Sequence, residues 1–338
     1  MDDRDKIYSI SVVVTGRCNL NCSYCHFFRT RSRKDVAYDI SDEQFMTYMK
    51  FIRAWSSSTQ SPTSYRFSGG EPMILGDRLF SLANKALEIV GTPPYILTAG
   101  KNLDEDWISK ARDSAISHIF VSMENPIRPD KGSVDPILLA QKIKTYNSES
   151  LPIIPGVCVV PNDCFSRLYE ICCWFYNELG RIPLICEINY GSYVSPSEDE
   201  WKHLEENLCR VVEDFFPKTH LNLFSSVIPE YAYGGIDPYL FELDLDNFHE
   251  IRDDNIAEKI PEIKSYVEAS SYPKLSCNQD YCPWISFCKN TKWYWQRDEN
   301  LSKLEKLRDY CRFKRLVSDT YYRVLEDANH PNTTNEIS

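Results

Sequence analysis

Three closely spaced cysteines near the start of the chain are the residues best suited to chemistry. Cys18, Cys22 and Cys25 are separated by three and then by two residues, so their thiolates can close on one iron–sulfur cluster. A protein-held [4Fe–4S] cluster usually takes four cysteines. Three cysteines leave one iron without a protein ligand, and an open iron can bind a small molecule. The spacing therefore predicts a cluster with one open coordination site.

A structural zinc site is the alternative for the same residues, because cysteine clusters in intracellular chains often hold Zn²⁺. His26 directly follows Cys25 and could in principle be the fourth ligand. Zinc sites usually show CxxC pairs and a complete set of four ligands. The context of these cysteines fits the iron–sulfur cluster better.

A glycine-rich run follows the second predicted strand. Its residues are Ser68-Gly69-Gly70-Glu71-Pro72. Two glycines allow close approach of the backbone and a positive φ, while a carboxylate and backbone carbonyls can accept hydrogen bonds from a ligand ammonium. Alone, such a run is compatible with a tight turn.

Together the CxxxCxxC and Gly-Gly-Glu-Pro runs resemble the radical S-adenosylmethionine (SAM) superfamily. In that family SAM chelates the fourth iron through its amino and carboxylate groups. Its reductive cleavage gives methionine and a 5′-deoxyadenosyl radical, which takes a hydrogen atom from the substrate. The resemblance implies that Gly69, Gly70 and Glu71 bind the methionine amino group.

The resemblance also assigns single residues at strand ends to SAM. It places Tyr24 beside the adenine, with a packed surface tyrosine as the alternative. Thr98 begins the run Thr98-Ala99-Gly100, where relatives often carry Thr-Asn-Gly. The resemblance also implies that Ser122 contacts SAM. Glu124, where relatives commonly have Asp, would face the SAM ribose or the substrate. Asn162 could line the barrel mouth or simply cap a turn.

A second cysteine group lies near the end of the chain and resembles the SPASM and twitch auxiliary-cluster extensions of the same family. Its four cysteines would suffice for one fully ligated auxiliary [4Fe–4S] cluster: Cys277, Cys282, Cys288 and Cys311. Cys311 falls in a helical pattern and could instead be a core thiol. The auxiliary cluster would then have an open iron and could bind substrate.

Three further residues are candidates for catalysis. Cys158 and Cys186 lie on predicted strands, and one could donate a hydrogen atom in an epimerase. Glu187 alternates with Asn189 on the sixth strand and could line the barrel mouth. The other cysteines sit mostly in apolar contexts and are expected in the core: Cys164, Cys172, Cys173 and Cys209.

Short apolar runs alternate with helical patterns, which predicts βα units around a parallel sheet. Six units make an α/β fold, a partial (β/α)6 version of the TIM barrel with its site at the carboxyl ends of the strands. Ser41, with Gln44 three residues later, begins the first long helix. Strands are expected at Ser9–Thr15, Tyr65–Phe67, Tyr95–Thr98, Ile119–Ser122, Pro155–Val160 and Leu184–Asn189. The later helices are expected at Leu79–Val90, Asp104–Ala115, Val134–Tyr146, Phe165–Leu179 and Glu198–Phe215.

The chain is expected to divide into a radical SAM partial barrel at 8–215, an auxiliary-cluster domain at 216–326 and a disordered tail at 327–338. About eight residues precede the first strand, which predicts no N-terminal leader-binding domain. Relatives with such a domain often modify peptides.

The composition of this 338-residue chain limits the classes of partner that it is expected to bind. A net charge of −11 argues against nucleic acid, and no apolar run suggests a membrane span or signal peptide, so a cytoplasmic protein is expected. In a reducing compartment, thirteen cysteines point to metal ligation, catalysis or packing. The basic run Arg29–Lys34 could meet an acidic substrate segment or a flavodoxin- or ferredoxin-type electron donor, or be a solvated loop.

Modification of a ribosomally made peptide or protein, by crosslink, thioether or epimerisation, is the favoured hypothesis. Dehydrogenation or epimerisation of a small molecule, such as an aminocyclitol or sugar, is the alternative. A non-catalytic metal-binding or electron-transfer protein is the rival from another class. The glycine-rich run and the six βα units argue against that rival.

Overall fold

One parallel sheet organises the part of the chain described by the computed structural model. That part comprises residues 8–22, 25–29, 37–60, 63–123, 126–127, 129, 132–159, 164–188, 196–219, 239–243, 250–268, 312, 316 and 319–320. The strand order is β6-β5-β4-β3-β2-β1-β7, and every neighbouring pair runs parallel. The strands are β1 (Tyr8–Thr15), β2 (Thr63–Gly69), β3 (Tyr95–Thr98), β4 (Ile119–Met123), β5 (Ile153–Val159), β6 (Leu184–Ile188) and β7 (Tyr239–Leu243).

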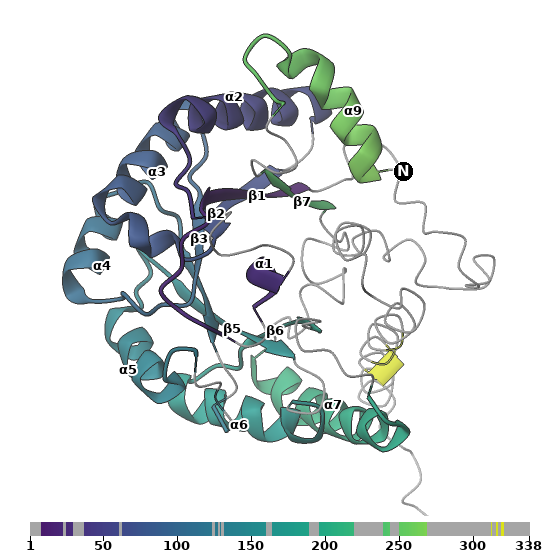
Figure 1. Cartoon of the computed structure of the whole chain (residues 1–338). Helices are drawn as coiled ribbons and strands as arrows, with labels where there is room; N and C mark the ends of the chain where they lie inside the picture. Colours follow the sequence, from purple (N-terminus) through teal and green to yellow (C-terminus); the bar gives the residue numbers. More distant parts are fainter. Residues whose placement is uncertain are drawn as a thin grey trace, which may run out of the picture.

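The long helices form an arc around the convex face of the sheet, while the short α1 lies on the concave side (Figure 1). The helices are α1 (His26–Arg29), α2 (Asp42–Thr59), α3 (Asp77–Val90), α4 (Glu105–Arg112), α5 (Pro136–Tyr146), α6 (Leu168–Leu179), α7 (Glu198–Thr219) and α9 (Ile256–Glu268), with the 3-10 turns η2 (Pro72–Leu75) and η3 (Phe165–Arg167). The predicted α/β partial barrel and its six βα units are confirmed.

Helix α2 shows how the sequence sets one element. Its N-cap Ser41 accepts a hydrogen bond from the backbone N–H of Gln44 at 3.1 Å, as the capping pattern predicts. Its apolar stripe is fully buried against the sheet. There Trp55 meets Tyr8 of β1 edge to face, and Phe45 meets Phe67 of β2.

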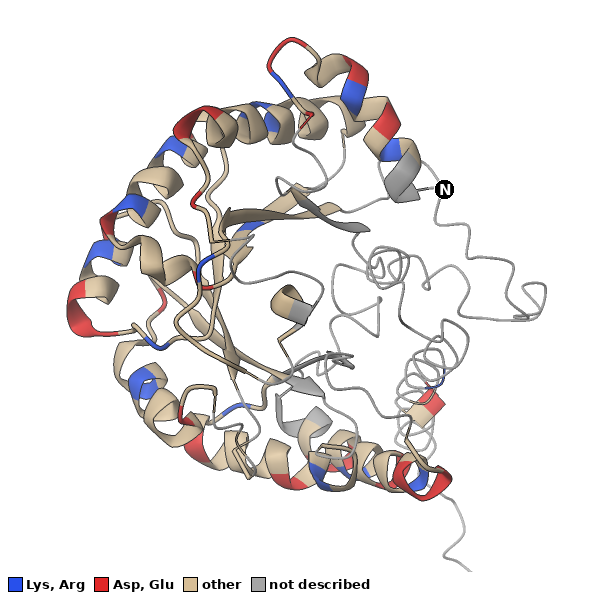
Figure 2. Ribbon diagram, viewed as in Figure 1, with Lys and Arg blue, Asp and Glu red and all other residues tan. Residues whose placement is uncertain are grey.

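The two faces of the sheet differ in chemistry. The convex face of β1 is apolar and joins the main core through Ile10, Val12 and Val14. The concave face carries buried hydroxyls, and the oxygens of Ser11 and Ser68 lie 2.6 Å apart. Among the described residues, most of the charged ones belong to the helices of the arc, and the strands contain few (Figure 2).

A seventh strand and a helix extend the sheet beyond the six predicted units. Strand β7 pairs with β1, and α9 packs on α2, where Thr47 donates a hydrogen bond to Asp253 at 2.8 Å. Strand β7 and helix α9 both belong to residues 216–326, the stretch expected to form the auxiliary-cluster domain. The domain boundary at 216 stays a prediction. Within the described ranges no helix is long and apolar enough to cross a bilayer.

Candidate active site

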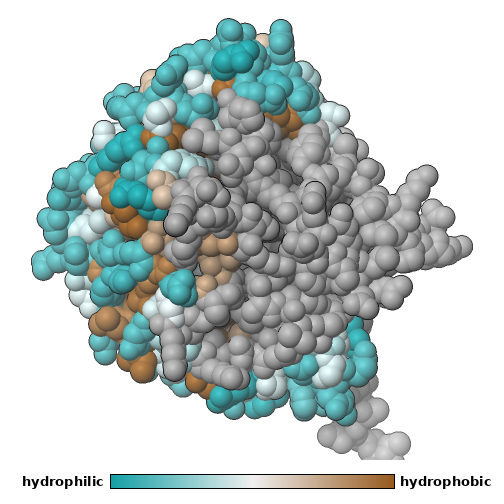
Figure 3. Space-filling view, in the orientation of Figure 1, coloured by the Kyte–Doolittle hydropathy of each residue, from teal (hydrophilic) through white to brown (hydrophobic). Residues whose placement is uncertain are grey.

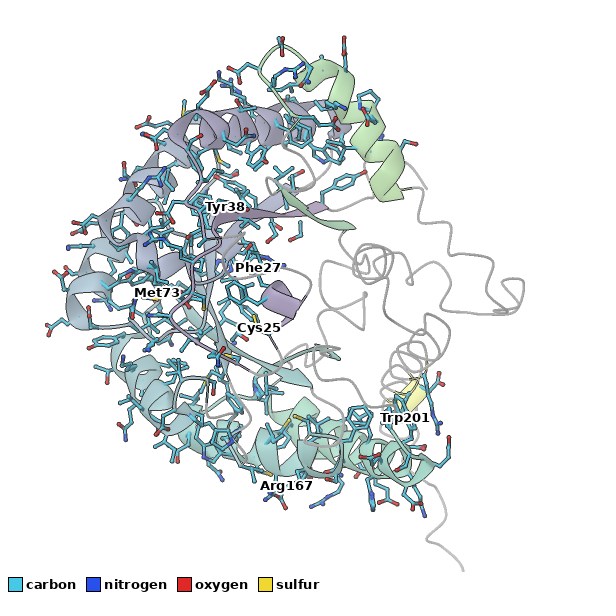
Figure 4. The ribbon with its side chains drawn as sticks, in the orientation of Figure 1. Cys25, Phe27, Tyr38, Met73, Arg167 and Trp201 are labelled. Carbon is cyan, nitrogen blue, oxygen red and sulfur yellow. The ribbon has the colours of Figure 1, made fainter. Side chains whose placement is uncertain are left out.

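The three N-terminal cysteines lie on one loop at the carboxyl end of β1, which we call the cysteine loop (residues 16–25). All three are partly exposed. A turn in which the Cys25 N–H donates to the Cys22 carbonyl at 3.3 Å closes the loop. Beyond it, Phe27 packs on Val13 in a small apolar cluster that Cys25 also contacts. Figure 4 labels Cys25 and Phe27 inside the arc of helices.

The first residues of the cysteine loop are held by an ion pair. The Arg17 guanidinium donates to both carboxylate oxygens of Asp39, at 2.8 and 2.6 Å. The Thr15 hydroxyl donates to the same carboxylate at 2.7 Å. Burial alone would raise the pKa of Asp39, but the hydrogen bonds from Arg17 and Thr15 outweigh it and lower the pKa below its usual range.

The loop also contacts the segment that precedes α5. The Asn21 N–H donates to the Gly132 carbonyl at 3.0 Å, and the Cys22 sulfur lies 3.7 Å from the same oxygen. One backbone carbonyl therefore fixes the middle of the cysteine loop.

The backbone of the Gly-Gly-Glu loop (residues 69–71) is hydrogen-bonded to the end of β1 and to the start of the cysteine loop. The Gly70 N–H donates to the Thr15 carbonyl at 2.9 Å, and the Glu71 N–H donates to the Arg17 carbonyl at 2.8 Å. Gly69 has a φ of +129°, and a Cβ there would lie 2.1 Å from the Thr15 oxygen. A Cβ at Gly70 would lie 2.2 Å from the Arg17 oxygen. Only glycines permit this approach, since any side chain would clash with a backbone carbonyl.

The Glu71 side chain points into the protein. It is 1% exposed, and it accepts hydrogen bonds from the Thr98 hydroxyl (2.6 Å), the Ala99 N–H (2.9 Å) and the Met73 N–H (3.1 Å). Burial raises the pKa of Glu71, and these three hydrogen bonds oppose that rise in part. Glu71 therefore ties the Gly-Gly-Glu loop to the end of β3.

Thr98 continues this connection. Its hydroxyl donates to Glu71 and accepts from the Gly100 N–H at 2.9 Å. The donor of the Thr98 hydroxyl and one of its two acceptor positions are thus used within the chain, and its side chain is buried.

Ser122 lies on β4 at the carboxyl edge and is partly exposed. By strand alternation it shares a face with Phe120. Its register partner on β5 is Gly156, where a Cβ would lie 2.3 Å from the Phe120 ring. The glycine therefore makes room for the ring beside Ser122.

The remaining candidates are placed by register or lie outside the described residues. Cys158 of β5 and Cys186 of β6 are register partners, and Glu187 follows on β6. The candidates outside the described residues are Tyr24, Glu124, Asn162, Asn189, Cys277, Cys282, Cys288 and Cys311. Their roles stay predictions.

Sequence reasoning missed Asp39 and Gly132. Asp39 stands 22 residues beyond Arg17, and no local pattern links the two. Gly132 acts through its carbonyl, which any residue type carries. Only the folded chain identifies such contacts.

The cysteine loop fits an iron–sulfur cluster. Thiolates are the usual cluster ligands, and three partly exposed cysteines lie on one loop whose backbone is hydrogen-bonded to the rest of the chain. In the described part of the chain no three His, Cys, Asp or Glu side chains are grouped round a single metal ion. A cluster spreads its thiolates over separate irons, so it does not require such grouping.

Comparison with known proteins gives matches of two kinds. Residues 12–127 match the family model described as "Radical SAM superfamily". The chain is 28% identical over 120 residues to the GTP 3′,8-cyclase of Clostridium botulinum, covering 36% of each protein. It is 27% identical over 120 residues to a probable GTP 3′,8-cyclase of Methanocaldococcus jannaschii, covering 35% of this chain and 37% of that protein. The chain thus matches about a third of the length of these curated relatives.

The second kind of match is to whole solved structures. Native anSMEcpe with bound AdoMet and Cp18Cys peptide matches with a TM-score of 0.64 at 18% identity, covering 96% of this chain and 100% of that one. The same protein with bound AdoMet alone gives a TM-score of 0.65. This likeness confirms the partial-barrel fold.

The family match includes the cysteine loop and the Gly-Gly-Glu loop, the two runs on which the resemblance was based. Members of that superfamily use a [4Fe–4S] cluster and SAM. The chain therefore carries a radical SAM domain over residues 12–127.

Proposed function

We propose that this chain is a radical SAM enzyme that modifies a ribosomally made peptide or protein. Cys18, Cys22 and Cys25 would hold the [4Fe–4S] cluster. When bound, the cluster and SAM supply a 5′-deoxyadenosyl radical that takes a hydrogen atom from the substrate. The observation that carries the proposal is the pair of backbone hydrogen bonds that join Gly70 to the end of β1 and Glu71 to the cysteine loop.

These hydrogen bonds give the two loops one fixed relative position. A ligand that spans both would find its contacts preorganised, which reduces the entropy lost on binding. The Glu71 carboxylate already accepts three hydrogen bonds from the chain. The contact with the SAM ammonium therefore falls mainly to backbone carbonyls of the Gly-Gly-Glu loop, which Glu71 positions.

The peptide substrate rests on likeness along the whole chain. The solved structure that matches 96% of this chain holds AdoMet and a peptide. One auxiliary cluster on Cys277, Cys282, Cys288 and Cys311 would complete the enzyme. A flavodoxin- or ferredoxin-type protein would deliver the electron.

A small-molecule substrate is the second candidate. The matches to GTP 3′,8-cyclases favour it, but they cover 120 residues, about the length of the radical SAM domain. They therefore bear on the shared domain more than on the substrate. The lower identity to anSMEcpe extends over nearly the whole chain, which is why we favour the peptide.

Anaerobic reconstitution with iron and sulfide tests the proposal. We expect a brown protein with about eight irons per chain, two [4Fe–4S] clusters, that releases 5′-deoxyadenosine from SAM after reduction. A colourless protein, or one that releases no 5′-deoxyadenosine, would contradict it. Incubation with deuterated candidate peptides then separates the two substrates, because only the true substrate transfers deuterium to 5′-deoxyadenosine.

A further inference from the structure

A third loop contacts the cysteine loop from the carboxyl end of β3, and we call it the β3–α4 loop (residues 99–104). The Lys101 ammonium donates a hydrogen bond to the Asn19 carbonyl at 3.3 Å. Asn19 lies directly after Cys18, and its side-chain amide donates to the Asn102 side-chain oxygen at 3.5 Å. The β3–α4 loop therefore places one positive charge against the stretch that carries the thiols.

The backbone that carries Lys101 is held by three hydrogen bonds. Lys142 of α5 donates to the Lys101 carbonyl at 3.0 Å. The Gly100 N–H donates to the Thr98 hydroxyl at 2.9 Å, and the Leu103 N–H donates to the Gly100 carbonyl at 3.2 Å. A side chain on a fixed backbone loses less conformational entropy when it makes a contact. The loop therefore favours a stable position of the ammonium beside the cysteine loop.

Arg17 is the charged residue of the cysteine loop itself, and its charge is balanced. Residues 16–25 contain no other charged residue. The Arg17 guanidinium pairs with Asp39 at 2.6 Å, so this pair adds little net charge beside the thiols. The electrostatic potential at the cysteine loop therefore depends on the neighbouring loops.

Three acidic residues follow Lys101 at the start of α4, and their charges oppose that of the lysine. Asp104 is the N-cap of α4, where the helix dipole partly compensates a negative charge. Asp106 pairs with Lys110 at 3.0 Å. Glu105 is exposed to water. The Lys101 ammonium differs from these carboxylates because it is hydrogen-bonded to the cysteine loop.

Hydrophilic residues make up much of the described surface over the helices on the face shown in Figure 3. Charges on such a surface are surrounded by water, which weakens their interactions. Lys101 is exposed as well, so its effect on the cysteine loop is expected to be moderate. Its ammonium nevertheless lies 3.3 Å from the carbonyl oxygen of the residue after Cys18.

We propose that Lys101 raises the reduction potential of the iron–sulfur cluster held by Cys18, Cys22 and Cys25. This inference rests on the proposed function, which assigns the cluster to these thiols. Reduction transfers one electron from an external one-electron reductant, so the cluster gains one negative charge and no bond forms or breaks. A nearby positive charge stabilises the reduced form relative to the oxidised form. Lys101 therefore makes the cluster easier to reduce.

A redox titration of the reconstituted enzyme, followed by electron paramagnetic resonance, tests the proposal. The signal to follow is the one that SAM changes, and it is titrated without SAM. At the midpoint potential of the parent, the ratio of reduced to oxidised cluster in Lys101→Met should fall about threefold, which for one electron is a midpoint about 28 mV more negative. Lys101→Arg keeps the charge and should titrate like the parent. The difference between the parent and Lys101→Met should shrink as salt is added.

Matched controls separate the charge of Lys101 from its contribution to structure. Asn102→Ala removes the other side-chain hydrogen bond of Asn19 but no charge. Lys144→Met removes a charge of α5 that pairs with Glu178 at 2.7 Å. Both variants should titrate like the parent. Glu105→Gln removes a negative charge, so its midpoint should move to a less negative potential, by less than the shift in Lys101→Met.

Several results would overturn the role of Lys101. They are an unchanged midpoint in Lys101→Met, or a shift of equal size in Lys101→Arg or in Asn102→Ala. A lower iron content in Lys101→Met than in the parent and Lys101→Arg would also overturn it, because the lysine would then be needed for cluster binding. Failure of the proposed function gives a different result: the parent chain itself would show no cluster signal that responds to SAM.

Discussion

The cysteine loop and the Gly-Gly-Glu loop follow adjacent strands and contact each other, yet they are built differently. The cysteine loop presents partly exposed thiols on a backbone held from outside by Asp39 and Gly132. The Gly-Gly-Glu loop presents backbone, and its one functional side chain, Glu71, is buried. In the proposed function, the cysteine loop would provide the cluster ligands and the Gly-Gly-Glu loop would fix their position. We therefore expect changes in the cysteine loop to lower activity, and changes in the Gly-Gly-Glu loop to lower both activity and stability.

Removing a thiol should give the largest change in activity with little change in stability. We expect Cys18→Ser, Cys22→Ser or Cys25→Ser to lower 5′-deoxyadenosine release by more than about 100-fold, which exceeds the loss typical of changing a residue that only hydrogen-bonds to a metal ligand. The unfolding free energy of the cluster-free chain should change by no more than about 0.5 kcal/mol, because the thiols are partly exposed. Product release and urea unfolding measure these two quantities. A loss of several kcal/mol would contradict the division between the two loops.

Adding a methyl group to the Gly-Gly-Glu loop should destabilise the folded chain. Gly69→Ala places a Cβ against the Thr15 carbonyl, so we expect a loss of about 3 kcal/mol in unfolding free energy together with loss of the cluster. Gly91→Ala is the matched control, because Gly91 also has a positive φ but open space around its Cβ position. The control should lose about 1 kcal/mol. Equal losses in the two variants would show that the contact between the loops is unimportant.

Changing Glu71 should have a smaller, pH-dependent effect. Glu71→Gln turns an amide N–H₂ toward one of three donors, so we expect a loss of about 1–3 kcal/mol. The pKa of Glu71 is raised in the folded chain, so its contribution is full below the unfolded pKa of about 4.3 and declines as the pH rises through the folded pKa. The stability gap between the parent and Glu71→Gln should therefore narrow as the pH rises. A gap that widens would contradict the buried position of Glu71.

The smallest effect is expected at the ion pair that holds the cysteine loop. Asp39→Asn should cost about 0.2–1 kcal/mol, because the pair is partly exposed. The pKa of Asp39 is lowered, so this contribution is present above about pH 4 and is lost as the pH falls through the folded pKa. Thermal unfolding of both proteins between pH 3 and pH 7 measures it. A difference that persists at the lowest pH would rule out the ion pair as its source.

Local sequence pattern predicted the elements well and their distant contacts poorly. Apolar alternation located β1 to β6, and the Ser41 cap fixed the start of α2. Strand β7 was not predicted. Its partner, β1, lies more than 220 residues earlier in the chain, and no local sequence pattern links two strands at that separation.

The sequence likewise predicted some features of the candidate site and not others. Residue type and spacing identified the cysteines and the Gly-Gly-Glu run. The inward direction of Glu71 and its bond to Thr98 were not predicted, because a carboxylate next to two glycines is equally compatible with a ligand contact. Burial decides between these roles, and burial depends on the whole fold.

Electron paramagnetic resonance of the reduced cluster, with and without SAM, tests the central claim most directly. A chain carrying Cys277→Ser, Cys282→Ser and Cys288→Ser would leave the cluster on Cys18, Cys22 and Cys25 as the source of the signal. An iron left open by three cysteines predicts that SAM changes the g-values of that signal. Spectra that are identical with and without SAM would show that SAM does not bind this cluster.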